Sequence, residues 1–597
     1  MTSAASAAAA AAADDDGDGT PASPAETLEL ILRRLLPFLL SAALSARTLV
    51  GRWRLLHSKL SLLLAALSDA AGSPHWPSNQ LFSDHLLPSL LSTLRTLRSL
   101  SAVCLDQDLP GGKLRLQSDV DIATSGLSLH LHDLHLLLRS GLLHHDGSLA
   151  SPADDSAAIV LPLPAPSASR AVLALFVRDI FARLQIGALD LKGKALDSLL
   201  ELLATDPAKI SRLVVEEGDL PLLLRLLDPS AHSLLRDRTA AVISILSTAS
   251  DASRHAVFEE GALGPLLRLL DSGPAVLKER AAIAIHALTA DHGCAWAVSA
   301  YGGVSILVAA CHSGSGSPSV QALAAGSLNN AAAIDDVRAA MVEEGAVSVL
   351  IELLSGNLEA QKNAALCLAS LAAMGGEEIR NAILQENGLT RLLQLLRVAS
   401  DPEAIDHALK AISACALAVS PTATKLLSSS PPLFAQLTDL IKRGSAGIQH
   451  SAAALVANLS PSEDIKRTMA EAMPALIKMM ENSKPSSAQE AAAAALTSLV
   501  AVRANRRELS RDEKSVTRLV QMLDPRSEAV AGKELPVAVV LALTSGSSGG
   551  ARRRLAEAGA CQHLQKLAEA DVPGAKKALQ RITGNRLKNL FSISWPQ

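Results

Sequence analysis

The sequence has few aromatic residues and no paired-cysteine motif. Only 2% of its 597 residues are aromatic, although 49% are hydrophobic. Leucine and alanine therefore supply most of the apolar character, which suits closely packed helices better than sheets, because strands favour aromatic and β-branched residues. The six cysteines form no Cys-x-x-Cys pair. Neither a zinc site nor a disulfide framework is indicated, and a reducing compartment is expected.

The chain also lacks a strong net charge and a long uninterrupted hydrophobic segment. Lys and Arg number 55 and Asp and Glu number 59, a net charge of −4, which argues against a dedicated nucleic-acid binder. The apolar stretch from Leu28 to Val50 is interrupted by Arg33, Arg34 and Arg47. It therefore predicts a buried or amphipathic helix and no transmembrane segment. The Ala- and Asp-rich start is typical of neither a secretory signal nor a transit peptide.

What the sequence does contain is a repeat of about 42 residues, which begins near residue 190 and indicates a helical array. Its clearest copies start with Glu-Glu-Gly at Glu216, Glu259 and Glu343, and continue with two apolar turns that end in a Leu-Leu pair. A short loop and a longer Ala-rich helix follow, and such a unit buries its apolar face only by stacking on its neighbour. The glycines of the turn are spaced by 41 or 43 residues and are Gly218, Gly261, Gly302, Gly345 and Gly388. The pattern predicts an α-solenoid, whose default function is binding rather than catalysis.

Composition divides the chain into successive segments. Residues 1–26 are of low complexity and are expected to be disordered, 27–145 form a Leu-rich helical domain without the repeat, and 146–170 form a Pro/Ser-rich linker. The repeats occupy residues 171–590 in about nine copies, and 591–597 form a C-terminal tail. The predicted fold class is all-α, a right-handed superhelical solenoid preceded by a helical N-terminal domain.

The repeats resemble armadillo (ARM) repeats. The matching elements are the Glu-x-Gly turn, the Leu-rich helix and an Ala-rich helix that ends near Leu-x-Asn, as in Leu328–Asn330 and Val456–Ser460. Phe176–Gly187 followed by Lys192–Leu200, and the end Gly584–Ser592, are similar to plant armadillo proteins related to U-box ubiquitin ligases. The resemblance implies an ARM superhelix that binds partner segments along its concave groove.

Two features of related families are missing. The sequence has no Cys-Pro dipeptide, and the linker before the repeats is too short for a U-box, so ubiquitin-ligase activity is not implied. Nuclear-import adaptors are similar in their armadillo arrays, whose grooves carry a ladder of Trp and Asn. At the Trp positions this chain has Ile283, Gly326, Leu366 and Ala454, which argues against import-adaptor function.

Polar residues of the long repeat helices are the candidate partner-binding residues. Asn and Gln donate and accept hydrogen bonds at once, which suits the main chain of an extended peptide. Bracing of turns and a solvated surface are the alternative interpretation of the same residues. The predicted groove residues are Arg236, Arg238, Lys278, Arg280, His286, Gln321, Asn329, Asn330, Gln361, Lys362, Asn363, Gln449, His450 and Asn458.

A histidine cluster is the only other conspicuous set of ligand-type side chains, formed by His130, His132, His135, His144 and His145. Two of them share a helix face, but neither Cys nor a His-Glu-x-x-His motif accompanies them, so polar helix surface is the preferred interpretation.

Gly546–Gly550 matches the letters of a Gly-x-Ser-x-Gly elbow. It follows a helical segment instead of a strand, so we expect a loop. No catalytic, cofactor or metal site is predicted.

The expected function is a non-enzymatic scaffold or adaptor for protein partners, with no nucleic-acid partner. The resemblance implies plant signalling or ubiquitin-linked regulation, in the cytoplasm or nucleus. Two alternatives stay open. One is a substrate-binding component of an E3 ubiquitin ligase pathway. The other is a membrane-associated organiser whose basic C-terminal stretch, from Val572, makes weak contact with acidic lipid.

Overall fold

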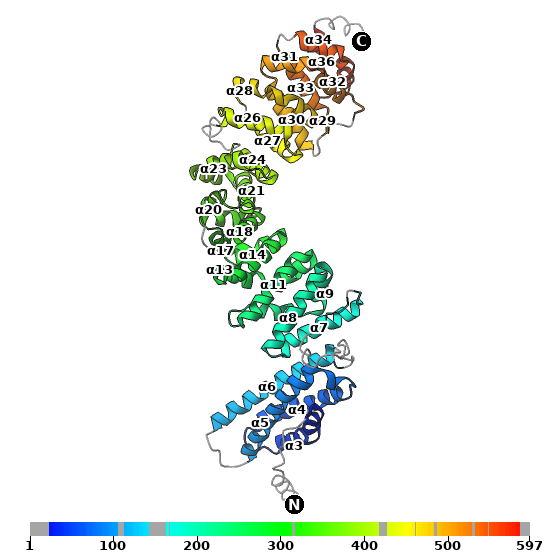
Figure 1. Cartoon of the computed structure of the whole chain (residues 1–597), viewed down its shortest axis with the longest axis vertical. Coiled ribbons are helices and arrows are strands. Elements are labelled where there is room, and N and C mark those ends of the chain that lie inside the picture. Colours follow the sequence, from blue (N-terminus) through cyan, green and yellow to red (C-terminus); the bar gives the residue numbers. More distant parts are fainter. Residues whose placement is uncertain are drawn as a thin grey trace, which may run out of the picture. The chain divides into compact units, whose positions relative to one another are not determined.

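The structure is a computed structural model that describes residues 23–105, 113–140, 143, 163–165, 167–312, 317–416, 427–459, 461–482, 486–527, 532–546 and 549–584. Helices are the only regular secondary structure in these residues (Figure 1). The predicted disordered N-terminus and linker lie mostly outside them, and the tail 591–597 lies wholly outside. The chain divides into two compact units, Met1–Pro265 and Leu266–Gln597.

A helical bundle opens the first unit. Arg52 on α4 pairs with Asp121 on α6 at 2.6 Å, and Lys59 on α4 donates to the Ser128 hydroxyl on α6. Since both contacts join residues the same distance apart in sequence, α4 and α6 run parallel. The elements of the bundle are α2 (Pro24–Leu30), the π-helical η1 (Ile31–Leu35), α3 (Leu36–Ser45), α4 (Val50–Ala71), the short η2 (Trp76–Ser78), the π-helical η3 (Leu81–Leu86), α5 (Leu87–Leu105) and α6 (Lys113–Ser140).

The core of this bundle continues into the helices that follow it. Ala182 of α7 (Arg170–Ile186) and Leu191 of α8 (Leu189–Thr205) belong to the same buried cluster as Trp53 and Phe82 of the bundle. A solenoid needs its terminal unit covered, because the apolar end face would otherwise meet water. The bundle therefore covers the start of the repeat region.

One whole repeat follows in the first unit, and its first two helices are both capped. Asp206 Oδ1 accepts from the amide of Lys209 at 3.1 Å, and Asp219 Oδ1 accepts from the amide of Leu222 at 3.0 Å, so both starts are N-capped. The long α11 packs against α8. The helices are α9 (Pro207–Glu217), α10 (Leu220–Arg225), α11 (Ser233–Ala249) and α12 (Asp251–Glu259), and α13 (Leu263–Ser272) spans the division between the units.

Helix triplets build the second unit, each with a first, a second and a third helix. The first helices are α15 (His292–Ala295) with α16 (Ala297–Ala300), α19 (Asp335–Glu343), α22 (Gly376–Gln385), α28 (Glu463–Thr468) with the short η4 (Met469–Ala472), α31 (Arg503–Arg511) and α34 (Gly549–Glu557). The second helices are α17 (Gly303–Cys311), α20 (Ala346–Leu353), α23 (Gly388–Val398), α26 (Pro431–Arg443), α29 (Met473–Asn482), α32 (Glu513–Met522) and α35 (Ala560–Glu569). The third helices are α14 (Ala275–Thr289), α18 (Pro318–Ala331), α21 (Leu358–Met374), α24 (Pro402–Ala416), α27 (Ala446–Leu459), α30 (Ser486–Leu499), α33 (Glu534–Leu543) and α36 (Ala575–Thr583).

The third helices form one continuous row. Each packs on the next, from α14 through to α36, and the labels α14, α18, α21 and α24 follow one another in Figure 1. Small side chains make this approach possible, since Ala324 and Ala325 of α18 and Ala364 and Ala365 of α21 are fully buried. Burying one face of every triplet against its neighbours replaces the single core of a globular domain. The predicted all-α repeat solenoid is confirmed.

In several copies, the backbone conformation explains why the repeat has a glycine at its turn. It joins the first helix to the second with a positive φ of 82° at Gly261, 64° at Gly302 and 72° at Gly345. Only glycine adopts this left-handed conformation without cost. In the next copy the left-handed residue is Asn387, at φ 60°, one position before the predicted Gly388. Asparagine tolerates this conformation because its short side chain bonds locally.

Gly218 is required for a different reason. Its φ is −94°, so no left-handed turn occurs there. A Cβ at this position would lie 2.6 Å from the ring of Phe181. Glycine at this position of the repeat therefore allows a left-handed turn in some copies, and in another copy it allows the close approach of Phe181.

Among the described residues, no single helix is long and apolar enough to cross a bilayer. The segments His292–Ala300 and Gly303–Cys311 reach that apolarity only together, and they are bent by 93°.

Candidate functional site

The predicted groove residues all lie on third helices. In the first unit, Arg236 and Arg238 are on α11. In the second unit they are on α14 (Lys278, Arg280 and His286), α18 (Gln321, Asn329 and Asn330), α21 (Gln361, Lys362 and Asn363) and α27 (Gln449, His450 and Asn458). We call the polar surface of α14, α18, α21, α24 and α27 the third-helix face.

One row of these residues braces the loop that precedes each third helix. Gln321 donates to the carbonyl of His312 at 3.0 Å, Gln361 to that of Gly356 at 3.0 Å, and Gln449 to that of Ile441 at 2.9 Å. Lys278 likewise donates to the carbonyl of Asp271 at 2.7 Å, and Arg236 donates to the carbonyl of Pro229 at 3.4 Å. Each bond satisfies a carbonyl that the end of the second helix or its loop leaves unpaired. The side-chain donors of this row therefore brace turns, which was the alternative interpretation of these residues.

A second row joins neighbouring third helices. Asn363 Nδ2 on α21 donates to the carbonyl of Ala322 on α18 at 2.8 Å. Ser370 Oγ on α21 donates to Asn329 Oδ1 on α18 at 2.9 Å. Asn330 on α18 donates to the carbonyl of His286 on α14 at 3.3 Å. These bonds hold the amide planes in fixed orientations across three consecutive helices.

The same amides keep part of their bonding capacity. Within the described residues, no donor reaches Oδ1 of Asn330 or Asn363, and no acceptor meets the amide protons of Asn329. A side-chain amide that is held by one end and unbonded at the other is suited to the main chain of a peptide.

None of the predicted groove residues lies on α24, which lies between α21 and α27 in the row. His407 Nδ1 of α24 lies 3.2 Å from the carbonyl of Lys362 on α21. On its other side, Asp406 accepts from Ser451 of α27 at 2.6 Å, and Ser413 accepts from Asn458 at 3.2 Å. The sequence could have indicated these residues of α24, because their partners recur at separations of 45 residues.

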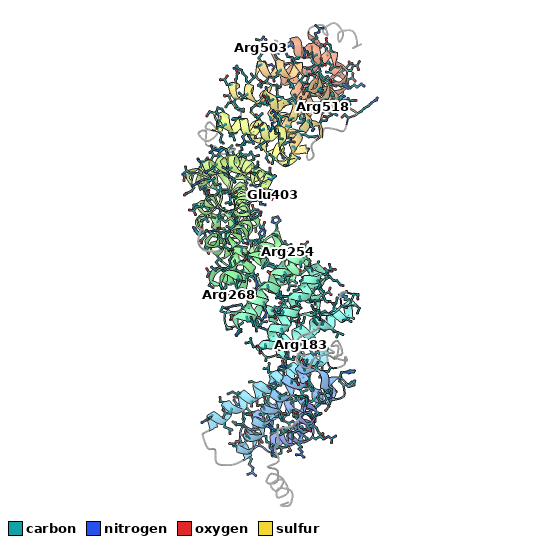
Figure 2. The ribbon with its side chains drawn as sticks, viewed as in Figure 1. Arg183, Arg254, Arg268, Glu403, Arg503 and Arg518 are labelled. Atoms are coloured by element: carbon teal, nitrogen blue, oxygen red, sulfur yellow. The ribbon has the colours of Figure 1, made fainter. Side chains whose placement is uncertain are left out.

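Charged groups on this face are neutralised in place. Lys362 Nζ lies 2.8 Å from Glu359 and 3.0 Å from Glu403, which Figure 2 labels on α24. Hydrogen bonds to Glu359 and Glu403 raise the pKa of Lys362 above its ordinary value. Burial alone would raise the pKa of Asp406, but hydrogen bonds from Lys410 and Ser451 outweigh it and the pKa is lowered. The face is a set of fixed ion pairs and amides.

Gly326 allows the tightest contact of the row. A Cβ at Gly326 of α18 would lie 2.7 Å from the ring of His286 on α14 and 3.2 Å from Nδ2 of Asn363 on α21. Burial lowers the pKa of His286, and likewise that of His407. The position at which import adaptors carry Trp is therefore occupied here by the side chains of two neighbouring helices.

A third row, on the first helices, was also missed by the sequence analysis. Arginines of these helices donate to carbonyls at the end of the preceding third helix, where backbone acceptors are unpaired. The bonds run from Arg338 to Ala332 at 2.7 Å and from Arg380 to Ala372 at 3.0 Å. In later repeats they run from Arg506 to Val500 at 3.0 Å and from Arg552 to Gly546 at 2.8 Å, and Arg254, labelled in Figure 2, bonds to Ser247 at 3.1 Å in the first unit.

The first unit has its own bridge between third-type helices. Arg238 of α11 pairs with Asp197 of α8. Nε of Arg236 is buried and has no partner among the described residues. Arg238 therefore braces neighbouring helices of the first unit, as the amides do in the second, whereas Arg236 bonds to the loop carbonyl of Pro229.

The histidine cluster is spread over α6. His130 Nε2 lies 3.0 Å from the Thr93 hydroxyl on α5, and burial lowers its pKa. His132 adjoins the buried Asp133, whereas His144 and His145 lie outside the described residues. Of the described histidines, His130 thus makes a contact between two helices of the bundle.

The other two sequence motifs lie near the end of the described residues. α33 ends at Leu543 and α34 begins at Gly549, so the last two letters of the predicted Gly-x-Ser-x-Gly loop, Gly549 and Gly550, are helical instead. Ser547 and Ser548 lie outside the described residues. On α36, Lys576 pairs with Asp571 at 2.9 Å and Arg581 donates to the carbonyl of Leu541 at 2.9 Å. Part of the basic C-terminal stretch is therefore used internally, and the rest of it, from residue 585, is outside the described residues.

Comparison with known proteins agrees with the repeat fold. Residues 30–142 match a domain of unknown function, DUF7032. The crystal structure of an engineered protein is similar with a TM-score of 0.58 and 25% identity, over 68% of this chain and 99% of that chain. No curated protein matches the sequence.

Two designed armadillo repeat proteins are similar over 41% of this chain. One is 25% identical with a TM-score of 0.37, over 99% of its own length. The other was solved in complex with the peptide (KR)4, and is 23% identical with a TM-score of 0.36, again over 99% of its own length.

Proposed function

We propose that this chain is a non-enzymatic scaffold or adaptor that binds segments of partner proteins across the third-helix face. One observation carries the proposal. Asn329, Asn330 and Asn363 are held by bonds between neighbouring third helices, while part of each amide is unbonded within the described residues. Side chains fixed in this way bind with little further loss of conformational entropy.

The dimensions of the row suit an extended peptide. Packed helices are spaced by about 8–10 Å, and an extended chain advances by about 3.3 Å per residue, so a peptide crossing the row meets a new helix about every third residue. The titratable groups Lys362, Glu403 and Asp406 are committed to ion pairs and hydrogen bonds. Such a face supports binding through many weak contacts more than it supports proton transfer.

The finer part of the proposal concerns the pathway. Resemblance to plant armadillo proteins supports a role in plant signalling or ubiquitin-linked regulation, in the cytoplasm or the nucleus. The chain would hold substrates for a separate ligase, because it has no Cys-Pro core of a U-box. Imaging of a fluorescent fusion and recovery of ubiquitin ligase subunits with the purified chain test this part.

Quantitative affinity purification with matched variants tests the binding function. The double variant Asn329→Ala/Asn458→Ala changes α18 and α27, and Glu352→Ala/Arg391→Ala changes exposed positions on the second helices α20 and α23. We expect the first variant to lose partners that the wild type and the second variant retain, with all three proteins folded at the assay temperature by circular dichroism. Equal recovery by all three proteins would refute binding at the third-helix face.

A further inference from the structure

One complete repeat of the second unit carries no formal charge. No Asp, Glu, Lys or Arg occurs from His292 to Ile334, although 19% of the whole chain is charged. This stretch includes the first, second and third helices α15 to α18. Surfaces of soluble proteins are usually mixed and charged, whereas the centres of protein interfaces are depleted of charged residues and enriched in Tyr, Trp and Phe.

The same repeat exposes two aromatic side chains. Trp296 is 54% exposed and Tyr301, the single tyrosine, is 55% exposed. They flank the one-turn helix α16, about 8 Å apart along its axis from the helical rise. By contrast, Trp53, Phe82 and Phe434 are fully buried.

Trp296 occupies a position that other first helices use for folding. Arg254 and Arg338, each 42 residues away in sequence, bond to carbonyls of the preceding third helix. A tryptophan at this position has one indole N–H in place of the guanidinium donors, and its side chain is more than half exposed. The repeat thus has an exposed interface-type residue at a position that elsewhere stabilises the fold.

The neighbouring first helix indicates what the aromatic pair would bind. α16 packs against α19, which with its following turn carries Asp335, Asp336, Glu343 and Glu344, all exposed. The only cation of α19 is Arg338, which is buried and pairs with Asp335. The aromatic rings therefore lie beside a surface of one sign. We propose that Trp296, Tyr301 and the acidic surface of α19 form a second docking site, on the first helices, for a Lys- or Arg-bearing segment of another protein.

Each part of the site has a separate task. The aromatic faces attract a guanidinium or ammonium group and provide apolar contact area. The carboxylates of α19 pair with further cations of the segment and increase its association rate at low salt. The site differs from the third-helix face, because Trp296 and Tyr301 belong to the first helix of their repeat.

Binding of a defined peptide to the full chain tests the site. The probe is a fluorescein-labelled dodecapeptide of alternating Arg and Ser, compared with one of alternating Glu and Ser, by fluorescence anisotropy. We expect the Arg peptide alone to bind, with lower affinity at higher salt. Trp296→Ala/Tyr301→Ala should weaken it about fivefold to thirtyfold, from the loss of two cation–π contacts. Met374→Ala, at an exposed apolar position of α21, is the matched control and should bind as the wild type does.

Charge reversal separates the acidic surface from the net charge. Asp336→Lys/Glu343→Lys changes α19, and Glu508→Lys/Glu513→Lys makes the same change in net charge on α31 and α32. The first variant should lose the peptide and the second should keep most of the affinity. Equal losses in both would overturn the site and indicate only long-range attraction.

Tryptophan emission locates the bound peptide. In a Trp595→Phe background, Trp296 is the exposed tryptophan among the described residues, since Trp53 and Trp76 are buried. The Arg peptide should protect Trp296 from acrylamide quenching, in the wild type and equally in Asn329→Ala/Asn458→Ala. An absence of protection, or its loss in the third-helix variant, would overturn a separate site. So would self-association through Trp296, seen by sedimentation, or preferential binding to phosphatidylserine vesicles.

Discussion

Asn363 donates from Nδ2 to the main-chain carbonyl of Ala322 at 2.8 Å, across a sequence separation of 41 residues. The bond joins α21 to α18 and repeats, with other residues, between the neighbouring helices of the row. Asn363→Ala should therefore lower the free energy of unfolding by about 1 kcal/mol, the net value of one hydrogen bond. Chemical denaturation measures it. Asn458→Ala, which removes a more exposed bond at 3.2 Å, is the control and should cost less. Equal effects would contradict a specific role for the Asn363 bond.

Gly345→Ala tests the left-handed turn of the repeat. Its φ is +72° and no atom lies within 4 Å of an added Cβ, so the cost is that of the backbone alone, about 1–2 kcal/mol. Gly447→Ala is the matched control. No atom lies within 4 Å of its Cβ either, but this glycine is in α27 at an ordinary helical conformation, where alanine is neutral or stabilising by up to about 1 kcal/mol. Thermal unfolding of the two variants should shift in opposite directions or differ clearly, and equal shifts would contradict the turn.

Arg338→Met tests the arginine row of the first helices. The buried guanidinium bonds to the carbonyl of Ala332 at 2.7 Å and pairs with Asp335. We expect a loss of about 1.5–3 kcal/mol, because the hydrogen bond involves a charged group. Arg467→Met is the control, since Arg467 pairs only with exposed carboxylates of its own helix and surface pairs contribute about 0–1 kcal/mol. If urea denaturation showed equal stability for the two variants, the capping role would be wrong.

Asp133 gives a pH dependence to the contact between the bundle and α8. Its side chain is 6% exposed and Oδ1 has no partner among the described residues. Burial raises its pKa, against smaller opposing effects of the charges on His132 and Lys192, and burial also lowers the pKa of Lys192. The folded chain thus binds the Asp133 proton more tightly than the unfolded chain does. Stability from this group is present below the ordinary pKa of 3.8 and is lost as the pH rises through the raised value.

Asp133→Asn should consequently be more stable than the wild type at pH 7, and the difference should shrink as the pH falls toward 4. Denaturation curves collected between pH 4 and 7 measure this difference. Asp121→Asn removes the exposed partner of Arg52 and is the control, because hydrogen bonding to Arg52 lowers the pKa of Asp121 and the sign of its pH dependence is reversed. A constant difference for Asp133→Asn would contradict burial as the cause.

The repeat fold could be predicted because its causes are local. The left-handed turn needs Gly at 261, 302 and 345, and the Ala-rich pattern of 318–331 indicates a helix that others approach closely. The sequence also predicted that the candidate groove residues lie on the long helices of the repeats, and they lie on third helices. It could not show that the side-chain amides of Gln321, Gln361 and Gln449 donate to loop carbonyls, since these bonds depend on where each loop lies in space.

Contacts between repeats were harder to predict. The residues of α24, such as His407 and Asp406, belong to no recognisable motif. Their role is apparent only from their hydrogen bonds to residues 45 positions away in the sequence. The arginine row has a detectable period, from Arg254 to Arg338 and Arg380, but Trp296 interrupts it. Because the period is interrupted, these arginines look like scattered surface charges in the sequence. Only their carbonyl partners in the structure show that they belong to one row.

Site-specific photo-crosslinking tests the central claim, that partners bind across the third-helix face. A benzoylphenylalanine is placed in turn at Lys410 and His450 on third helices, and at Glu352 and Arg391 on second helices, in the full chain. We expect the same partner to be crosslinked from Lys410 and His450, and not from Glu352 or Arg391. Crosslinks formed mainly from the second-helix positions, or equally from all four, would contradict it.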